Sequence, residues 1–477
     1  MPEGAGQWWA VLQLGSTALA VASIPSVLLR RRGRPMAALS WILVLVALPV
    51  LGVALWWLLG RMHLERQRRR RRRAHERLAP ALTAVRDRVR APAARPVLGF
   101  CRLPDHLRRG IFPASAGNRC RLLVDATTAY PEMERAIEAA RHHVHALFYI
   151  WRDDATGRRF RDLLCAKARE GVEVRALYDG IGSLGLSHAY KRALRDAGVQ
   201  VATFLPLGVR TLRAALNFRN HRKILVVDAE RAFVGGINIG DEYTRDWHDL
   251  AVELRGPVVD QLQEVFADDW HYAAREDLAS ADYFGKSPAV DGADAAECAV
   301  IASGPDFPAY NPTHEALFAA VVTAQSRLWI MTPYFVPGPA LMAALRSAAF
   351  RGVDVRLYLP RRSDVRLVEM AARSYYPDLL DAGIRVFEYL PGFLHAKAAI
   401  VDESLAFLGS ANLDARSFRL NFEASCFVTS ASFVAQLAAM MAADEARCSE
   451  ITRDYLAAQP AARQIVDAAA HLLSPLL

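Results

Sequence analysis

The sequence predicts an α/β protein made of two similar sheet-and-helix halves with pseudo-twofold symmetry, preceded by a hairpin of two transmembrane helices. Three observations lead to this prediction. Two long uncharged segments lie near the N-terminus, short apolar strands alternate with amphipathic helices from about residue 120, and one set of polar residues recurs at the same spacing in both halves. With 477 residues, the chain is long enough for several domains with buried cores.

The first element is the membrane hairpin. Residues 4–29 and 35–60 contain no charged side chain, and each run is long enough to cross a hydrocarbon layer of about 30 Å as a helix. We therefore expect transmembrane helices over roughly 8–29 and 37–59, within a first domain of residues 1–60. A pair of buried core helices is the alternative.

An arginine-rich segment follows the hairpin. Between Arg30 and Arg90 there are 16 arginines, no lysine and three acids, so this segment carries +13 and the rest of the chain −4 of the total +9. Residues 61–110 include six consecutive arginines, Arg68–Arg73, and we expect a juxtamembrane linker that binds anionic headgroups or is simply solvated. The positive-inside rule then places the following domains in the cytoplasm, although the arginines between the two helices act in the opposite direction. The acidic remainder argues against a nucleic-acid partner.

The body of the chain is a repeat. The segment "GVEVRALYDG" at 171–180 corresponds to "GVDVRLYLPR" at 352–361, and "DAGVQV" at 196–201 corresponds to "DAGIRV" at 381–386. Strands alternating with helices predict a mainly parallel sheet flanked by helices, built twice. We expect the two halves at 111–285 and 286–477, with a shared site where they meet. The expected strands are His145–Trp151, Val172–Tyr178, Val199–Phe204, Arg327–Phe335, Val353–Leu359 and Ile384–Tyr389.

The recurring polar residues are the candidate site. The first half reads "HRKILVVDAERAFVGGIN" and the second "HAKAAIVDESLAFLGSAN". Each copy has His, Lys two positions later, Asp seven later, Gly fourteen later, Asn seventeen later and an acid twenty-eight later. The candidates are His221, Lys223, Asp228, Asn238 and Asp249 in the first copy, and His395, Lys397, Asp402, Asn412 and Glu423 in the second.

This spacing has a structural meaning. Residues two apart in a strand point to the same face, so the His and Lys of each copy should project together. A hairpin then returns the Gly and Asn beside the His, and glycine lets the backbone approach a ligand closely. Imidazole, ammonium and carboxamide groups together suit a phosphate group. Two facing copies would place one imidazole on either side of the phosphorus, as in-line displacement requires.

Each candidate also has a purely structural explanation. A single His at the start of a strand or a single Lys usually has no catalytic function. Asp228 and Asp402 fall at expected hairpin turns, where Asp commonly binds backbone amides, and Asp249 and Glu423 could be ordinary surface acids. The duplication favours function most strongly for the His and Lys residues, and less strongly for the acids.

The duplicated H-x-K-x4-D motif, followed by G-G/S-x-N, resembles the phospholipase D superfamily. The phrases "NHRKILVVD", "AFVGGINIGDEY", "TPYFVP", "LHAKAAIVD", "GSANLDARSF", "NFE", "SGPD" and the closing "LLSPLL" are similar to those of bacterial cardiolipin synthases, as is the two-helix N-terminus. The resemblance spans nearly the whole chain. The two copies differ in one respect, because the first has about eleven more residues between its "DAG" and its His than the second. We expect this loop, at 208–220, to line the lipid entrance.

The resemblance implies a phosphatidyltransferase, a cardiolipin synthase that joins two phosphatidylglycerol molecules and releases glycerol through a phosphatidyl-histidine intermediate. It implies His221 as the nucleophile and His395 as the acid and base. The Lys and Asn side chains would hold the phosphate oxygens, and Asp249 and Glu423 would orient the histidines. It also implies a multi-pass protein of the bacterial inner membrane.

Several functions compete with this interpretation. A phospholipase D-type hydrolase or another phosphatidyltransferase is the nearest alternative, and a superfamily nuclease or a non-catalytic membrane scaffold is more distant. The six cysteines are scattered without paired spacing, so we expect neither a zinc site nor a disulfide framework. No metal or other cofactor is expected, and the partners are phosphatidylglycerol and anionic membrane lipids. The sequence leaves the oligomeric state and the acceptor preference open.

Overall fold

The structure is a computed structural model that describes residues 3–31, 35–57, 64–89, 98, 110–206, 208, 217–292, 295–307 and 310–472. The chain divides into two compact units, residues 1–70 and residues 71–477. The four domain boundaries expected from the sequence remain a prediction.

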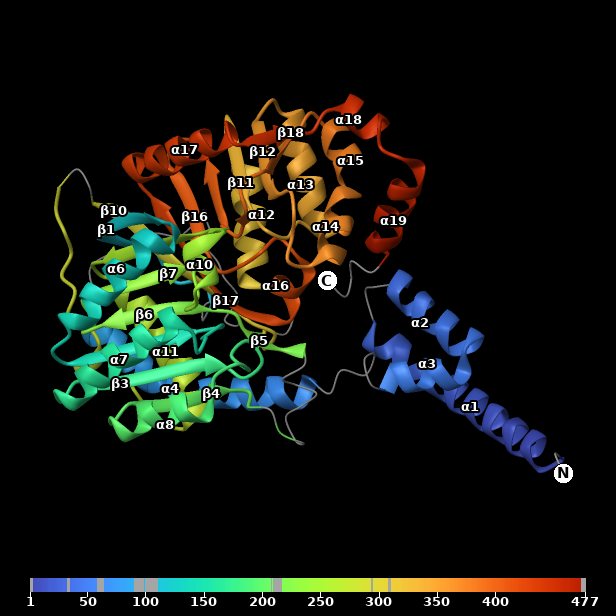
Figure 1. Cartoon of the computed structure of the whole chain (residues 1–477), viewed down its shortest axis with the longest axis horizontal. Coiled ribbons are helices and arrows are strands. Elements are labelled where there is room, and N and C mark those ends of the chain that lie inside the picture. Colours follow the sequence, from blue (N-terminus) through green and yellow to red (C-terminus); the bar gives the residue numbers. More distant parts are fainter. Residues whose placement is uncertain are drawn as a thin grey trace. The chain divides into compact units, whose positions relative to one another are not determined.

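The first unit contains the helices α1 (Glu3–Arg30), α2 (Pro35–Ala47) and α3 (Pro49–Leu55) (Figure 1). The second expected helix is divided at Leu48, where the backbone leaves the helical region with φ −133° and ψ 69°. Pro49 follows and has no amide hydrogen to donate to the preceding turn. Within the described residues, no helix is both long and apolar enough to cross a membrane. The two expected transmembrane helices are therefore not confirmed.

The second unit is built on one 16-stranded sheet (Figure 1). Strands of the first half are β1 (Ser115–Val124), β2 (His143–Phe148), β3 (Glu173–Asp179), β4 (Gln200–Phe204), β5 (Arg219–Asn220), β6 (Lys223–Val227), β7 (Arg231–Gly235), β8 (Trp247–His248) and β9 (Leu250–Arg255). Those of the second half are β10 (Ala296–Ser303), β11 (Arg327–Met331), β12 (Asp354–Pro360), β13 (Arg385–Tyr389), β14 (Phe393–Leu394), β15 (Ala398–Val401), β16 (Leu405–Gly409), β17 (Asn421–Thr429) and β18 (Cys448–Glu450). β8 and β14 form a separate two-stranded sheet.

The strand order shows the repeat. From the centre outward, the first half runs β1-β9-β7-β6-β2-β3-β4 and the second β10-β17-β16-β15-β11-β12-β13, and β1 pairs with β10. Only β2-β3-β4 and β11-β12-β13 are parallel within these paths. The expected mainly parallel sheet is therefore mixed, because the strands that carry the motif are joined by short hairpin turns and a hairpin can only be antiparallel. Two similar α/β halves are confirmed.

Helices cover both faces of the sheet. First-half helices are α6 (Asp125–Glu138), α7 (Ala155–Arg169), α8 (His188–Asp196), α10 (Glu242–Arg245) and α11 (Val258–Ala274). Second-half helices are α12 (Pro312–Thr323), α13 (Pro339–Phe350), α14 (Arg366–Arg373), α15 (Tyr376–Asp381), α16 (Ala415–Arg419), α17 (Ala431–Glu445), α18 (Arg453–Ala457) and α19 (Ala461–His471).

The side chains of β2 show how the faces are divided. Val144, Ala146 and Phe148 belong to the apolar core that α6, α7 and α8 complete. His145, between them in the strand, stacks on Phe266 of α11 instead. Because alternate residues of a strand point to opposite faces, α11 covers the other face. In the second half, α17 takes the corresponding place, since Glu445 contacts Arg356 and Tyr358 of β12 while Leu357, between them, faces the core.

Helix α4 (Leu64–Val89) contains the whole run Arg68–Arg73 and contributes one of these arginines to the interior of the second unit. The buried side chains Ala74, Leu78, Leu82 and Val85 continue a helical stripe that begins at Arg71. Its neighbours Arg69, Arg70, Arg72 and Arg73 are exposed.

Arg71 binds the acidic end of α11. Its guanidinium lies 2.6 Å from Asp268 and 2.5 Å from Asp269, and donates to the Asp268 carbonyl at 2.7 Å. Asp269 also pairs with Arg222 at 2.7 Å and accepts from the Asn220 amide at 2.9 Å. Since Asn220 and Arg222 flank His221, the carboxylate that binds Arg71 also binds the side chains on either side of a candidate site residue. One arginine of the expected headgroup-binding run is thus part of the protein interior.

We predict that Arg71→Ala lowers the free energy of unfolding of the second unit by about 1–3 kcal/mol, because Asp268 and the buried Asp269 each lose a charge-assisted hydrogen bond, although Asp269 keeps Arg222 and Asn220. Arg72→Ala is the matched control. Its side chain is exposed, so the free energy should change by no more than about 0.5 kcal/mol. Chemical unfolding followed by tryptophan fluorescence measures both, and equal values for the two variants would contradict the prediction.

Candidate active site

The first imidazole is held by a residue of the other half. His221 lies between β5 and β6 and is buried. Its Nδ1 is 3.0 Å from Oε2 of Glu423 on β17 and 3.1 Å from the Ser410 carbonyl oxygen. The carboxylate therefore accepts the Nδ1 proton, which leaves Nε2 with its lone pair in the neutral ring.

The second imidazole has the reciprocal arrangement. His395 follows β14, and its Nδ1 is 2.5 Å from Oδ2 of Asp249, which lies between β8 and β9. Each histidine is thus oriented by the acid of the opposite copy. The sequence predicts that these acids orient the histidines, but spacing alone cannot show that the pairs cross between the halves.

Two small parallel strand pairs make this crossing possible. β5 pairs with the start of β17, and the His221 amide donates to the Phe422 carbonyl at 2.8 Å. β8 pairs with β14, and the His395 amide donates to the His248 carbonyl at 2.8 Å. Each histidine backbone is therefore fixed to the segment that carries its carboxylate partner.

The two carboxylates are themselves held in place. Glu423 accepts from the hydroxyls of Ser410 and Ser417 at 2.5 and 3.0 Å, and from the Asn421 amide at 3.2 Å. Asp249 accepts from its neighbour's amide, Leu250 N, at 2.8 Å. A buried carboxylate with several donors is fixed in one orientation, and it passes that orientation to the imidazole.

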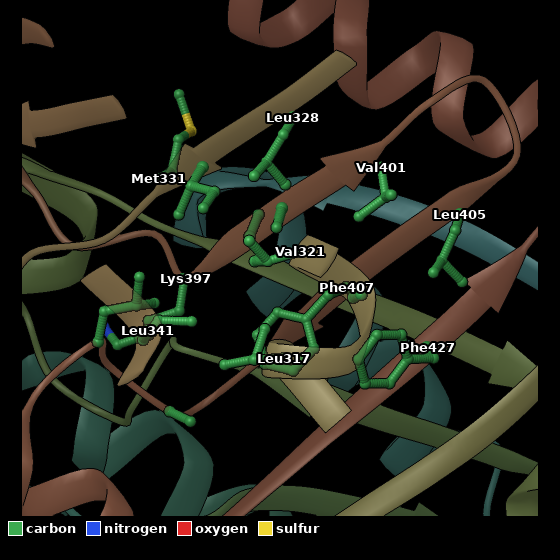
Figure 2. Close-up of a pocket in the computed structure, with 16 residues that line it drawn as sticks. Leu317, Val321, Leu328, Met331, Leu341, Lys397, Val401, Leu405, Phe407 and Phe427 are labelled. Carbon is green, nitrogen blue, oxygen red and sulfur yellow. The ribbon is translucent and has the colours of Figure 1, made fainter. Parts of the chain in front are cut away.

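The lysines lie beside the histidines of their own copies. Lys223 Nζ donates to the His221 carbonyl at 2.5 Å, and Lys397 donates in the same way to the His395 carbonyl. Figure 2 shows Lys397 next to Leu341 and among apolar side chains of the second-half core. The space enclosed there is about 10 Å³, room for one water at most, so it is no lipid site.

Burial sets the charge of both lysines. Complete burial lowers the pKa of Lys397 to about 8, although Asp249 and Glu423 act in the opposite direction. Burial also lowers the pKa of Lys223 well below its ordinary value. Both ammonium groups therefore lose their protons more readily than a solvated lysine does.

The same causes keep the imidazoles neutral. Burial, helped by the charge of Lys397, lowers the pKa of His395 to about 3, against the effect of Asp249. Burial lowers the pKa of His221 as well, with Glu423 acting against it and both lysines adding to it. Because each lysine influences the imidazoles of both halves, the four groups form one electrostatic site.

The two carboxylates stay ionised in this site. Burial opposes the charge of Asp249, but Lys397 and His395 outweigh it and lower the pKa of Asp249. Burial likewise opposes the charge of Glu423, and His221 with Lys223 reverses that effect. The site is therefore two neutral imidazoles, each bound to an ionised carboxylate, with two buried lysine side chains beside them.

The two asparagines differ in their contacts. Asn238 accepts from Ile150 N at 2.9 Å and donates to the Tyr243 hydroxyl. Asn412 Oδ1 is buried and has no hydrogen-bond partner among the described residues, so it can accept a hydrogen bond from a ligand. That both bind substrate oxygens remains a prediction.

Asp228 and Asp402 bind backbone amides, as Asp commonly does at hairpin turns. Asp228 accepts from the amides of residues 141–143, and Asp402 accepts from those of residues 325–327. Each lies one strand length beyond its lysine, at the far end of β6 or β15, with a positive φ of 54° or 55°. The strand that begins at the site carries these acids away from it.

The motif glycines serve the sheet rather than a ligand. A Cβ atom on Gly235 would lie 2.3 Å from the Leu250 carbonyl, and one on Gly409 would lie 2.1 Å from the Ser425 hydroxyl. The expected close approach is therefore to the neighbouring strand. In the first copy, a Cβ on Gly236 would lie 2.1 Å from the Asp249 carboxylate, whereas the second copy has Ser410 at that position, which binds Glu423.

Sequence reasoning missed the aromatic side chains at the site. The Tyr149 ring lies 4.8 Å from the His221 ring, and the Trp247 and Phe393 rings lie 4.6 and 5.5 Å from the His395 ring. Trp247 lies two residues before Asp249, and Phe393 lies two residues before His395. This spacing could have indicated from the sequence that both aromatic residues are near the site. Between the described residues, no group of His, Cys, Asp and Glu side chains could hold a metal ion.

His248 was missed as well. Its ring binds Asp125 and Asp444, both at 2.8 Å, and its carbonyl receives the His395 and Ala396 amides. Burial opposes protonation of this ring, but the two carboxylates outweigh it and raise its pKa to about 9. A charged His248 therefore fixes the segment that precedes Asp249.

The chain matches a known family over both halves. Residues 133–270 and 317–444 match the family described as "Cardiolipin synthase, PLD-like domain", which is more than half of the chain. The chain belongs to this cardiolipin synthase family. Residues 18–61 also match the domain described as "Phospholipase_D-nuclease N-terminal".

Members of the cardiolipin synthase family match nearly the whole chain. Cardiolipin synthase A of Pseudomonas aeruginosa is 42% identical over 469 residues, covering 96% of this chain and 94% of that protein. Cardiolipin synthase of Alkalihalophilus pseudofirmus is 36% identical over 470 residues, covering 96% and 92%. The phosphatidylserine synthase of Haemophilus influenzae Rd KW20 shares the fold, with a TM-score of 0.59 at 15% identity over 78% of this chain and 98% of that one.

We predict that Asp249→Asn and Glu423→Gln each lower kcat by on the order of 10²-fold in this family member, because the imidazole loses the carboxylate that selects its tautomer. Steady-state kinetics with lipid micelles measure the effect. Asp228→Asn is the control, since it lies at the far end of β6. Its kcat should stay within about threefold of wild type after correction for folded protein.

We predict a fall in kcat/KM as the pH rises through about 8, the pKa of Lys397, because the ammonium is lost above it. Lys397→Arg should move this fall to higher pH, since guanidinium stays protonated. The measured quantity is the ratio of activity at pH 9 to that at pH 7, so a uniform loss from the larger side chain does not matter. An unchanged ratio in the arginine variant would contradict this assignment.

Proposed function

We propose that the protein transfers a phosphatidyl group from one phosphatidylglycerol to another, giving cardiolipin and glycerol. The observation that carries this proposal is the crossed pair of carboxylate-held histidines with two buried lysines beside them. Two imidazoles, each with Nδ1 bound and Nε2 available, provide a nucleophile and a proton carrier for one phosphodiester. The membership of the cardiolipin synthase family supports the choice of lipid.

The first half-reaction breaks the bond between phosphorus and the glycerol headgroup. Nε2 of His221 attacks phosphorus, and Nε2–H of His395 gives its proton to the departing glycerol oxygen. The product is phosphatidyl-His221 with free glycerol. The 2.5 Å contact with Asp249 supports His395 as the group that carries the positive charge, since a close carboxylate stabilises the imidazolium.

His395 must be protonated when this step begins. In the free site, burial and Lys397 lower its pKa to about 3. A bound phosphodiester brings a negative charge between the lysines, which offsets their effect and raises that pKa. Protonation of His395 and substrate binding therefore support each other.

The second half-reaction forms cardiolipin. A headgroup hydroxyl of the second phosphatidylglycerol attacks phosphorus, His395 takes the hydroxyl proton, and the bond to His221 breaks. Lys223 and Lys397 stabilise the charge on the phosphate oxygens in both steps, with Asn238 and Asn412 as further candidates. Both imidazoles return to their starting forms.

We also propose that residues 1–60 hold the protein at the bacterial cell membrane as a multi-pass anchor, with the second unit in the cytoplasm. The first unit exposes many large apolar side chains, such as Leu14 with 76% and Leu43 with 67% of its surface accessible. An exposed apolar surface of this kind is typical of membrane contact. The exposed arginines of the run would then bind anionic headgroups, without Arg71.

Product analysis tests the function. With phosphatidylglycerol vesicles, the full-length protein should give cardiolipin and glycerol as main products, and added glycerol should reverse the reaction because the two diesters are close in energy. A lipid hydroxyl held in place can compete with water, since its effective molarity reaches roughly 10⁵ M. Phosphatidic acid as the main product would instead indicate a hydrolase.

His221→Ala and His395→Ala are the matched variants for this assay. Each should lose nearly all turnover, since acid–base catalysis alone contributes about 10²–10⁴-fold. Denaturing the wild-type protein during turnover of labelled lipid should leave the label on His221. Label on His395 would reverse the assigned functions of the two histidines.

A further inference from the structure

A hollow lined by charged and aromatic residues lies beside the aromatic side chains that contact His395. It has a volume of about 600 Å³, within the range of about 300–1,000 Å³ that is usual for ligand sites. Among the residues that line it are Arg361, Arg362, Asp246, Asp364, Trp247 and Phe393. We refer to it as the Arg361 pocket.

Two aromatic residues of the Arg361 pocket contact His395. Trp247 and Phe393, which line it, pack against each other at 4.9 Å and against the His395 ring at 4.6 and 5.5 Å. The arginines follow β12, and Leu390 and Gly392 of the pocket follow β13. The pocket is therefore at the carboxyl ends of parallel strands, where ligands of α/β sheets usually bind.

Hydrogen bonds fix the loop that presents the arginines. Arg361 N donates to the Tyr389 carbonyl at 3.1 Å, and Ser363 N donates to the Glu369 carboxylate at 3.0 Å. The Tyr334 hydroxyl donates to Asp364 at 2.7 Å. The guanidinium of Arg361 lies 3.9 Å from Glu388, a loose contact that leaves both arginine side chains exposed.

The matching position of the first half is closely packed. In the repeat, Gly180 corresponds to Arg361, and the next residues are Ile181 and Gly182. A Cβ on Gly180 would lie 2.6 Å from the Leu205 carbonyl, and one on Gly182 would lie 2.3 Å from the Tyr149 carbonyl. The backbone therefore closes this position in the first half, and two arginines occupy it in the second.

We propose that the Arg361 pocket binds the headgroup of the second lipid, an anionic glycerophosphodiester, with Arg361 and Arg362 on its phosphate. The proposal rests on the proposed function. The attacking hydroxyl must reach His395, which takes its proton, so the acceptor headgroup belongs on this side. Guanidinium groups match phosphate geometry, and the carboxylates of Asp246 and Asp364 can accept hydrogen bonds from glycerol hydroxyls.

This assignment distinguishes the two molecules that can accept the phosphatidyl group from His221, which are free glycerol and a second phosphatidylglycerol. Free glycerol leaves and re-enters beside His395, but it carries no phosphate and needs no arginine. The second phosphatidylglycerol presents the same glycerol hydroxyl together with a phosphate. The arginines should therefore favour lipid transfer over glycerol exchange, although both reactions use the same phosphatidyl-His221 bond.

The test compares Arg361→Gln/Arg362→Gln with wild type in two assays on full-length protein in phosphatidylglycerol–detergent micelles. Incorporation of labelled glycerol into phosphatidylglycerol reports exchange, and cardiolipin formation at sub-saturating lipid reports transfer. We expect transfer to fall at least about tenfold, as the loss of charge-assisted hydrogen bonds implies, while exchange falls much less. Arg361→Lys/Arg362→Lys should recover part of the transfer, because it keeps the charge without the fork.

Two controls make the result decisive. Arg346→Gln/Arg453→Gln removes the same charge from exposed positions outside the pocket and should change neither assay. Equal losses of transfer and exchange in the pocket variant, or unchanged transfer, would overturn the proposal. If the wild-type protein gives neither cardiolipin nor exchange, the proposed function itself fails, which is a different result.

Discussion

The site depends on two carboxylates, each of which binds the histidine of the other half. His221 is oriented by Glu423, and His395 by Asp249, so each imidazole depends on a side chain that the other copy supplies. Neither half contains both the histidine and the acid of either of these two pairs. The continuous sheet with β1 and β10 at its centre, and the small pairs β5–β17 and β8–β14, hold the two contributions in register.

The repeat keeps the reacting groups alike and lets their surroundings differ. The lysines bind corresponding carbonyls, and Asp228 and Asp402 bind corresponding amides. Ser410 faces Gly236 in the alignment, and the arginine loop after β12 faces a loop closed on Tyr149 and Leu205. A reaction that uses two imidazoles can keep the same reacting groups in both halves. A donor lipid and an acceptor lipid differ, so the residues that surround them are expected to differ as well.

Much of the site could be predicted because its residues recur at fixed spacings within a short stretch of sequence. The offsets identify the His, Lys and acidic residues, and the duplication distinguishes them from isolated polar residues. The crossing of the acids depends on which strands become neighbours in space, and no offset within one copy contains that information. Asp228 and Asp402 share the regular spacing, but the strand that follows each lysine places the acid at its far end, away from the imidazole. The parallel strands were predicted correctly. The hairpins that carry the motif are antiparallel, so the sheet as a whole is mixed rather than mainly parallel.

The position of Arg71 within a uniform run has a consequence for how the segment tolerates change. A helix advances by about 100° per residue. Inserting or deleting one residue therefore shifts the helix on one side of the change by one position, and different side chains come to occupy its buried positions. Here the residues before and after Arg71 are also arginines. A one-residue change in the length of the run would still present an arginine to Asp268 and Asp269. The buried ion pair would be retained. The residues that precede the run would be rotated about the helix axis.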